Sequence, residues 1–146
     1  DNAKNWALAR LADVLIMNET YPLRLTGIDD PERALLEIAR AGPCIVLSTR
    51  GAKGCLLVQD GQVVSYPAFA IAPVDTTGAG DAFHGGFLYG LLKGLPLPKT
   101  IRLASAVAAI NCGFVGGRQG LPCREAVETF LREHPFADPE TKKKEV

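Results

Sequence analysis

One stretch guides the interpretation of the whole sequence, Val74-Asp75-Thr76-Thr77-Gly78-Ala79-Gly80-Asp81-Ala82-Phe83-His84-Gly85-Gly86-Phe87. Two carboxylates enclose a run of hydroxyl and glycine residues, and an apolar, glycine-rich segment follows. Small residues let a backbone approach a ligand closely, and the free N–H groups at a helix start favour an anion. Asp81 beside such a site is able to take a proton from a hydroxyl while the amides hold a phosphate. The alternative is that Thr76, Thr77 and Asp81 only cap a helix.

The composition is that of a soluble globular protein. Of the 146 residues, 47% are hydrophobic and 22% are charged, which is enough to bury a core. The formal net charge is +0, so no field is available to steer nucleic acid or an anionic membrane, and the short basic run at 142–144 is expected to be a solvated tail. No apolar run approaches the roughly 20 residues that cross a bilayer, which also excludes an intramembrane aspartyl protease with a Gly-x-Gly-Asp motif.

The cysteines predict neither a zinc site nor a disulfide framework, because none of them forms a Cys-x-x-Cys pair. We expect buried, reduced thiols and therefore a cytoplasmic protein. The four are Cys44, Cys55, Cys112 and Cys123.

Hydrophobic periodicity predicts a βαβ unit followed by a hairpin. A helix over 3–11 precedes a strand over 13–17, which we expect to be buried on both faces. A short helix ending at Thr26-Gly27 and a second helix starting at Asp30-Pro31 lead to a strand over 44–48, the pattern of a parallel sheet. A turn at 49–54 then leads to a strand over 55–58, and Asp60-Gly61 joins it to an antiparallel strand over 62–66.

The second part of the chain is predicted to be helical. We expect a glycine-rich helix over 80–93, a helix starting at Leu97 with an alanine-rich face, an irregular loop over 111–120 and a final helix over 124–133. The inward side chains of the final helix are predicted to be Ala126, Val127, Phe130 and Leu131. We find no internal repeat and no linker, so the chain is expected to form one unit.

The stretch from Asp75 to Phe87 resembles the C-terminal signature of the ribokinase-like (PfkB) carbohydrate kinases. Three further segments resemble the family at the expected distances: Ala12-Asp13 to Asn18, Thr49-x-Gly51-x-x-Gly54, and Gly116-Gly117-Arg118 to Leu121-Pro122. The resemblance implies an α/β fold, the ribokinase-like three-layer α/β/α with a mainly parallel sheet, of which only the C-terminal portion is present. Residues 1–146 would be the nucleotide-binding and catalytic part, without the N-terminal sugar-binding part and lid. The start at Asp1 rather than Met fits this expectation.

The resemblance also implies a reaction, the transfer of the γ-phosphate of ATP to a hydroxyl of a sugar or sugar-like substrate. Asp81 would be the base, and the amides of Gly78, Ala79 and Gly80 would form the anion hole. Asp75, with Thr77 and nearby carbonyls, would bind a monovalent cation such as K⁺. The alternative for Asp75 is that it only caps the Thr-Thr turn.

Thr49, Gly51 and Gly54 would contact ATP, although a plain turn also explains them. Asn18 would bind the nucleotide and help to organise Mg²⁺, but Tyr21 stands where the family commonly has Glu. Glu19 is a displaced substitute, and the alternative for Asn18 is a helix cap.

For two further residues, both a functional and a purely structural interpretation are kept. His84, one turn after Asp81, would reach substrate or would be an ordinary surface or packed histidine. Arg118 would meet phosphate or the adenine ribose, or would be a solvated loop arginine.

Several assignments stay open at the level of the whole protein. The alternatives to a sugar kinase are a nucleoside or vitamin kinase of the same superfamily, a non-catalytic nucleotide-binding relative, or an inactive fragment. The substrate is not specified, and a homodimer is left open because dimers of the family often form through the lid.

Overall fold

The computed structural model describes residues 2–137 and 139–141, and the basic run at 142–144 lies outside them. These residues form two compact units, one containing 2–66 and 139–141 and the other 67–137. The sequence shows no linker at this division, and one undivided domain stays a prediction. The division falls where the hairpin ends at Tyr66 and the chain leaves the sheet.

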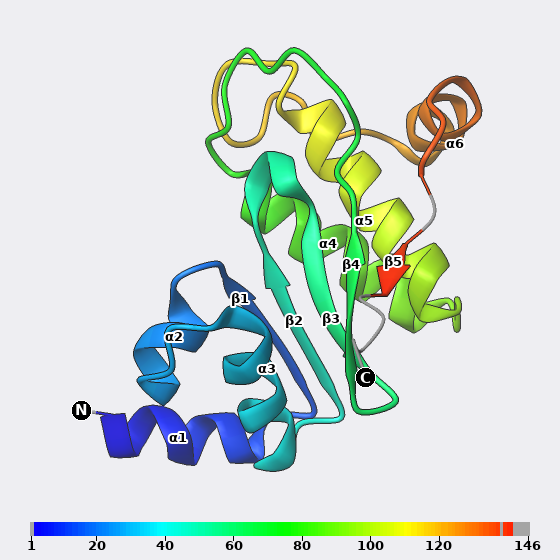
Figure 1. Ribbon diagram of the computed structural model, residues 1–146. Coiled ribbons are helices and arrows are strands. Elements are labelled where there is room, and N and C mark those ends of the chain that lie inside the picture. The colour runs from blue at the N-terminus through cyan, green and yellow to red at the C-terminus, as the bar shows by residue number, and fades with distance from the viewer. Residues whose placement is uncertain (1, 138, 142–146) are drawn as a thin grey trace. The chain divides into compact units, whose positions relative to one another are not determined.

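The first unit is a sheet with three helices (Figure 1). Its helices are α1 (Asn2–Leu11), α2 (Tyr21–Thr26) and α3 (Pro31–Arg40), with a short 3-10 turn at Gly51–Lys53. Its strands are β1 (Val14–Asn18), β2 (Ile45–Thr49), β3 (Cys55–Gln59), β4 (Gln62–Tyr66) and β5 (Glu140–Thr141), in the order β1-β2-β3-β4-β5. Apart from the short β5, each element was predicted from the sequence.

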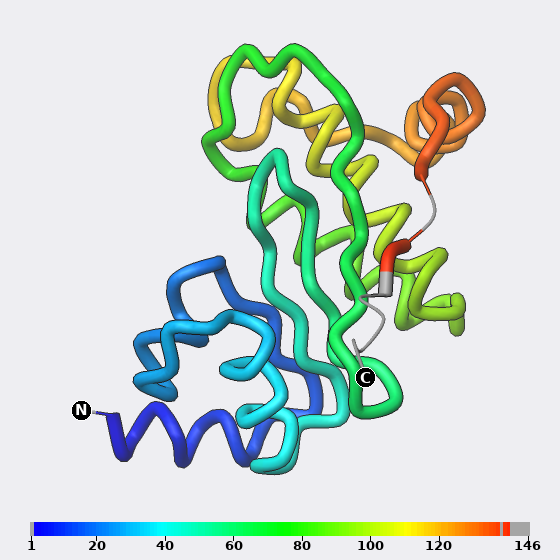
Figure 2. Tube along the Cα trace, in the orientation of Figure 1, coloured from blue at the N-terminus to red at the C-terminus, as the bar shows by residue number. Residues whose placement is uncertain are grey.

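The sheet is mixed rather than mainly parallel within this chain. β1 and β2 are parallel, and the pairs β2–β3, β3–β4 and β4–β5 are antiparallel. A parallel crossover needs a dozen or more residues. The connection through α2 and α3 is that long, whereas residues 50–54 and the Asp60-Gly61 turn are too short and join antiparallel strands (Figure 2).

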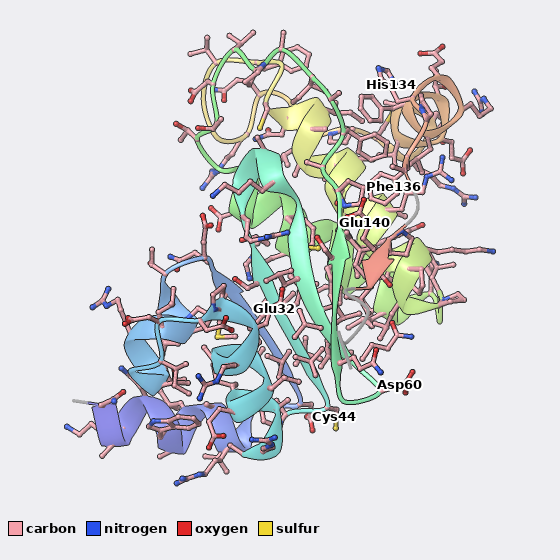
Figure 3. All side chains as sticks on the ribbon, viewed as in Figure 1. Glu32, Cys44, Asp60, His134, Phe136 and Glu140 are labelled. Carbon is pink, nitrogen blue, oxygen red and sulfur yellow. The ribbon has the colours of Figure 1, made fainter. Side chains whose placement is uncertain are left out.

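Local signals explain the helix and hairpin boundaries in this unit. The side chain of Asp30 accepts a hydrogen bond from the Arg33 N–H at 2.7 Å, which caps α3. Gly27 ends α2 in the left-handed conformation, with φ 71°. Asp60 and Gly61 both have positive φ, 51° and 71°, as a tight two-residue hairpin requires (Figure 3).

The core of the first unit lies between α3 and the sheet, and the edge strand is less buried than predicted. Leu35, Ile38 and Val46 are fully buried there. In β1, by contrast, only Met17 is buried, and the rest of the apolar run is half-buried. The prediction of burial on both faces was therefore wrong for most of this strand, because β1 has a neighbour on one side only in the described sheet.

The second unit contains α4 (Ala79–Leu92), α5 (Leu97–Asn111) and α6 (Arg124–Glu133). The first two pack backbone against backbone, since a Cβ added to Gly86 would lie 2.8 Å from the Cα of Ala104. The inward residues of α6 are Val127, Phe130 and Leu131, whereas Ala126 is exposed, contrary to the prediction. Residues at 127, 130 and 131 share one helix face, and 126 lies beside it.

The loop that follows the sheet supplies part of this second core. Phe69 is buried, and its ring lies 5.0 Å from that of Phe130 and 4.8 Å from that of Phe136. Phe136 follows α6 in the chain (Figure 3).

Two of the four cysteines differ from the predicted burial. Cys55 and Cys112 are buried, whereas Cys44 and Cys123 are exposed free thiols. Cys44 begins an apolar run in the sequence, but it precedes β2 instead of lying inside it (Figure 3).

Candidate active site

The stretch that organises the sequence forms a turn that runs directly into α4. Gly78 is the residue before the helix and has φ 75°, a conformation that L side chains rarely adopt. Asp81 follows in the first turn of α4, and its carboxylate is exposed. The sequence predicted both the helix start and a carboxylate on its first turn, and the structure confirms this local arrangement.

The backbone amides at the start of α4 are not equivalent. The Ala79 N–H donates to the Thr76 carbonyl at 3.2 Å. None of the described residues accepts a hydrogen bond from the N–H groups of Gly78, Gly80 or Asp81. Free amides at a helix N-terminus form a positive site for an anion. Of the three amides predicted to form an anion hole, those of Gly78 and Gly80 are free.

Asp75 joins this turn to the glycine-rich loop that follows α5. Its Oδ1 accepts from the Thr77 N–H at 2.9 Å and its Oδ2 from the Gly116 N–H at 2.8 Å. The Cys112 carbonyl accepts from the N–H groups of Val74 and Asp75, at 2.8 and 3.2 Å. The hydrogen bonds from Gly116 and then Thr77 lower the pKa of Asp75, so the carboxylate is held ionised. The turn-capping alternative describes this geometry, and the cation role stays a prediction.

The same two loops touch at a pair of glycines. A Cβ added to Gly78 would lie 2.7 Å from both the Cα and the carbonyl oxygen of Gly117. No side chain fits at that contact. The close approach is therefore a second reason, besides the positive φ, why position 78 requires glycine.

Asn111, at the end of α5, is a residue of this region that the sequence reasoning missed. It is fully buried, and its Nδ2 donates to the Thr77 carbonyl at 3.4 Å. No described residue donates to its Oδ1. The signal available in the sequence was one amide side chain at the end of an alanine-rich helix.

The other predicted nucleotide contacts lie together in the first unit. Asn18 and Thr49 end the parallel strands β1 and β2 and stand opposite each other in the register. The Thr49 hydroxyl donates to the Met17 carbonyl at 3.3 Å. Asn18 Oδ1 accepts from the Tyr21 N–H at 3.0 Å, so the helix-cap alternative for Asn18 describes its observed contacts.

The Thr49-x-Gly51-x-x-Gly54 segment forms a compact turn. Gly51 and Gly54 both have positive φ, 55° and 83°, and the Arg50 N–H donates to the Gly54 carbonyl at 2.7 Å. Glu19 forms an ion pair of 3.1 Å with Lys53 in this turn. Glu19 is thus paired with a cationic side chain of this turn.

His84 and Arg118 are both exposed. The His84 Nδ1 lies 2.7 Å from the Gly80 carbonyl oxygen, so Nδ1 carries the proton and Nε2 faces away from that carbonyl.

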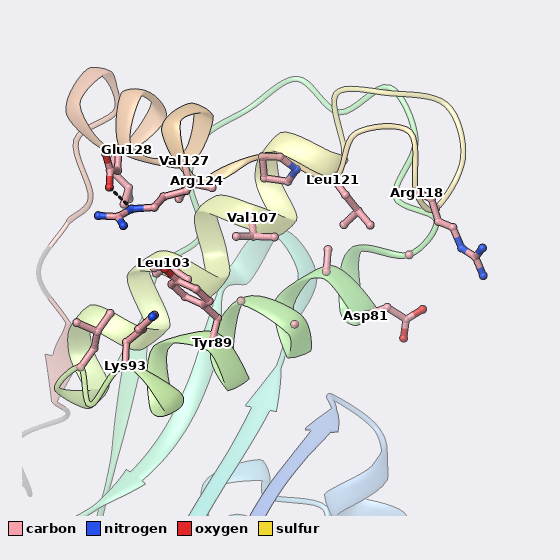
Figure 4. A pocket seen from close by; sticks show the side chains of 18 of the residues that line it. Asp81, Tyr89, Lys93, Leu103, Val107, Arg118, Leu121, Arg124, Val127 and Glu128 are labelled. Carbon is pink, nitrogen blue, oxygen red and sulfur yellow. Dashed lines mark hydrogen bonds and ion pairs between the residues drawn. The ribbon is translucent and has the colours of Figure 1, made fainter.

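A cavity of about 1020 Å³ lies between α4, α5 and α6 within the second unit. Asp81 and Arg118 extend from one end of it, and Lys93, Arg124 and Glu128 lie at the other (Figure 4). Its middle is lined by apolar side chains that include Tyr89, Leu103, Val107, Leu121 and Val127.

The predicted site residues thus form two groups, one in each unit. The first contains Asn18, Thr49, Gly51 and Gly54, and the second contains Asp75, Thr77, Gly78, Ala79, Gly80 and Asp81. Among the residues that the structure describes, no group of His, Cys, Asp or Glu side chains is arranged to hold a metal ion. Within the same ranges, no helix has the length and apolar character needed to span a membrane.

Known proteins are similar to this chain in both sequence and fold. The chain is 34% identical over 132 residues to a ribokinase of Haemophilus influenzae, covering 87% of this chain and 43% of that protein. It is 43% identical over 94 residues to a cytidine kinase of Thermococcus kodakarensis, covering 62% of this chain and 34% of that protein. The chain therefore spans less than half the length of these relatives.

A solved structure confirms the predicted ribokinase-like α/β fold class. It is a fructokinase of Vibrio cholerae bound to fructose, ADP and a calcium ion, with a TM-score of 0.82 and 32% sequence identity, covering 89% of this chain and 44% of that one. Residues 4–124 match the sequence model of the family described as pfkB family carbohydrate kinase. The resemblance found in the motifs is thereby confirmed, and the chain belongs to the pfkB family of carbohydrate kinases.

Proposed function

We propose that this protein transfers the γ-phosphoryl group of ATP to a hydroxyl of a sugar or nucleoside. The observation that carries the proposal is the start of α4, where the exposed Asp81 carboxylate stands beside backbone amides that no described residue occupies. The relatives named as a ribokinase and a cytidine kinase support this reaction class. The ADP bound to the similar fructokinase supports an adenine nucleotide as the phosphate carrier.

In this mechanism Asp81 accepts the proton of the attacking hydroxyl as that oxygen bonds to phosphorus. The bond between phosphorus and the bridging oxygen of ADP breaks, and ADP leaves with the electron pair. The free amides of Gly78 and Gly80 stabilise charge on the transferred phosphoryl group. The Ala79 amide joins them if it releases the Thr76 carbonyl, to which its hydrogen bond of 3.2 Å is long.

Cations fit the site through oxygen atoms. Asp75 and the Thr77 carbonyl are the donors that we propose for a monovalent cation such as K⁺, because hard cations prefer oxygen ligands. Mg²⁺ binds to few carboxylates and mainly to substrate phosphates. We propose Asn18 as a residue that would help to hold the magnesium nucleotide, and Thr49, Gly51 and Gly54 as nucleotide contacts, all from the first unit. A bound cation would neutralise phosphate charge and order the turn.

The test is the Asp81→Asn variant of the native polypeptide, assayed by transfer of labelled γ-phosphate from ATP to a panel of sugars and nucleosides. We expect turnover to fall about 10²–10⁴-fold because the base is lost. ATP affinity, measured by calorimetry, should persist because the amides remain. The matched control is Asp60→Asn at the exposed hairpin tip, which should leave both quantities unchanged.

The outcomes separate the candidate functions. Near-normal turnover of Asp81→Asn would remove this residue from the mechanism. Binding of ATP by the unmodified protein with no transfer to any acceptor would favour a regulatory relative. Transfer to nucleosides in preference to sugars would favour a nucleoside kinase, in line with the cytidine kinase relative.

A further inference from the structure

We propose that Arg118 binds the phosphate groups of the nucleotide, as a positive side chain next to the free amides of α4. This inference rests on the proposed function and assigns a specific role to a residue outside the signature stretch. The loop that carries Arg118 is held by backbone contacts, whereas the guanidinium makes no hydrogen bond or ion pair with the described residues.

The guanidinium of Arg118 has no partner among the residues that the structure describes. Its backbone N–H donates to Gln119 Oε1 at 3.2 Å, but no carboxylate or carbonyl of the described chain contacts the side chain. Arg40 and Arg124, by contrast, are paired, with Glu37 at 3.2 Å and with Glu128 at 2.7 Å. The Arg118 charge is therefore available to a ligand.

The loop that carries Arg118 is held against the start of α4. Gly117, its neighbour in the chain, packs on Gly78, and Gly116 donates to the Asp75 carboxylate at 2.8 Å. Because these contacts hold the two residues that precede Arg118, its side chain projects from a defined place. Figure 4 shows its guanidinium and the Asp81 carboxylate at the same end of the cavity.

A phosphate ligand at this end needs a positive side chain beside the carboxylates. The Asp81 and Asp75 carboxylates are both negative, and they would repel a polyphosphate that approaches the free amides. Arg118 is the cationic side chain among the cavity-lining residues at this end, since Lys93 and Arg124 lie at the other (Figure 4). A guanidinium offers a planar fork of donors that matches two phosphate oxygens. A neutral sugar would not need that charge, whereas ATP and ADP would.

The experiment measures nucleotide affinity by calorimetry for the unmodified protein and for Arg118→Gln and Arg118→Lys. The ligands are ATP, ADP and adenosine. We expect Arg118→Gln to weaken ATP and ADP binding about tenfold, as for the loss of one charge-assisted contact, and to leave adenosine binding unchanged. Arg118→Lys should recover part of the affinity, because it keeps the charge without the fork. Arg124→Gln, which removes a paired arginine at the opposite end, is the matched control and should bind ATP normally.

The possible failures are distinct. If the unmodified protein binds neither ATP nor ADP, the proposed function fails and the role of Arg118 fails with it. If it binds ATP and Arg118→Gln binds ATP equally well, only the role of Arg118 is overturned. Equal weakening of ATP and adenosine would also overturn it, because the effect would then not involve phosphate.

Discussion

Replacement of Gly78 by alanine tests the geometry on which the candidate site depends. Two costs are expected. A non-glycine residue at φ 75° costs about 1–2 kcal/mol. The new Cβ would also lie 2.7 Å from backbone atoms of Gly117, which cannot turn away as a flexible side chain would. Overpacking of this kind costs about 1–3 kcal/mol. We therefore expect Gly78→Ala to lower the free energy of unfolding by about 2–5 kcal/mol.

Gly94 provides a matched control in the same unit. Its φ is 65°, and a Cβ added there would meet nothing within 4 Å. Gly94→Ala should therefore show the conformational cost alone, about 1–2 kcal/mol. The difference between the two variants isolates the contact between Gly78 and Gly117.

The assay is urea unfolding followed by circular dichroism, with the free energy extrapolated to water. Trp6, the only tryptophan, reports on the first unit by fluorescence, so coincidence of the two transitions tests for two-state unfolding. If the two alanine variants cost the same within about 0.5 kcal/mol, the contact with Gly117 does not constrain the turn. The reasoning that links this turn to the glycine-rich loop would then be refuted.

Two further predictions concern titratable groups. The pKa of Asp75 is lowered from 3.8, so its contribution to stability is present above that value and is lost as the pH falls through the lowered pKa. Asp75→Asn should therefore weaken the dependence of the free energy of unfolding on pH below about pH 4. An unchanged dependence in urea unfolding would contradict this. Two thiols, those of Cys44 and Cys123, should react rapidly with an aromatic disulfide reagent. The buried Cys55, whose pKa burial raises to about 12, and Cys112 should react only on unfolding, and four fast thiols would contradict the predicted difference.

Much of the fold follows from local sequence. The Asp60-Gly61 turn, the Asp30-Pro31 helix start and Gly27 at a helix end each act over a few residues, so their conformations are readable from the chain. The parallel pairing of β1 and β2 follows from the helices between them. The signature around Asp81 was sufficient to identify the family before any contact was known.

Errors arose where burial depends on distant neighbours. Cys44 and Ala126 were predicted to be buried from their apolar surroundings in the sequence, yet both are exposed. An apolar run shows that a segment has a buried face, but not which residue at its end lies on that face. The number of strands beside β1 likewise could not be read from its own residues.

The sequence by itself determined the family and the residue types at the turn before α4, because the motif is contiguous and its chemistry is local. Only the tertiary structure decided how that turn is held. Asp75 bonds to Gly116, Gly78 packs on Gly117, and Asn111 reaches the Thr77 carbonyl. The partners in these contacts stand more than 30 residues apart in the chain, and no spacing rule connects them. Their contact depends on how α4 and α5 pack, and this packing brings Arg118 to the end of the cavity where Asp81 lies.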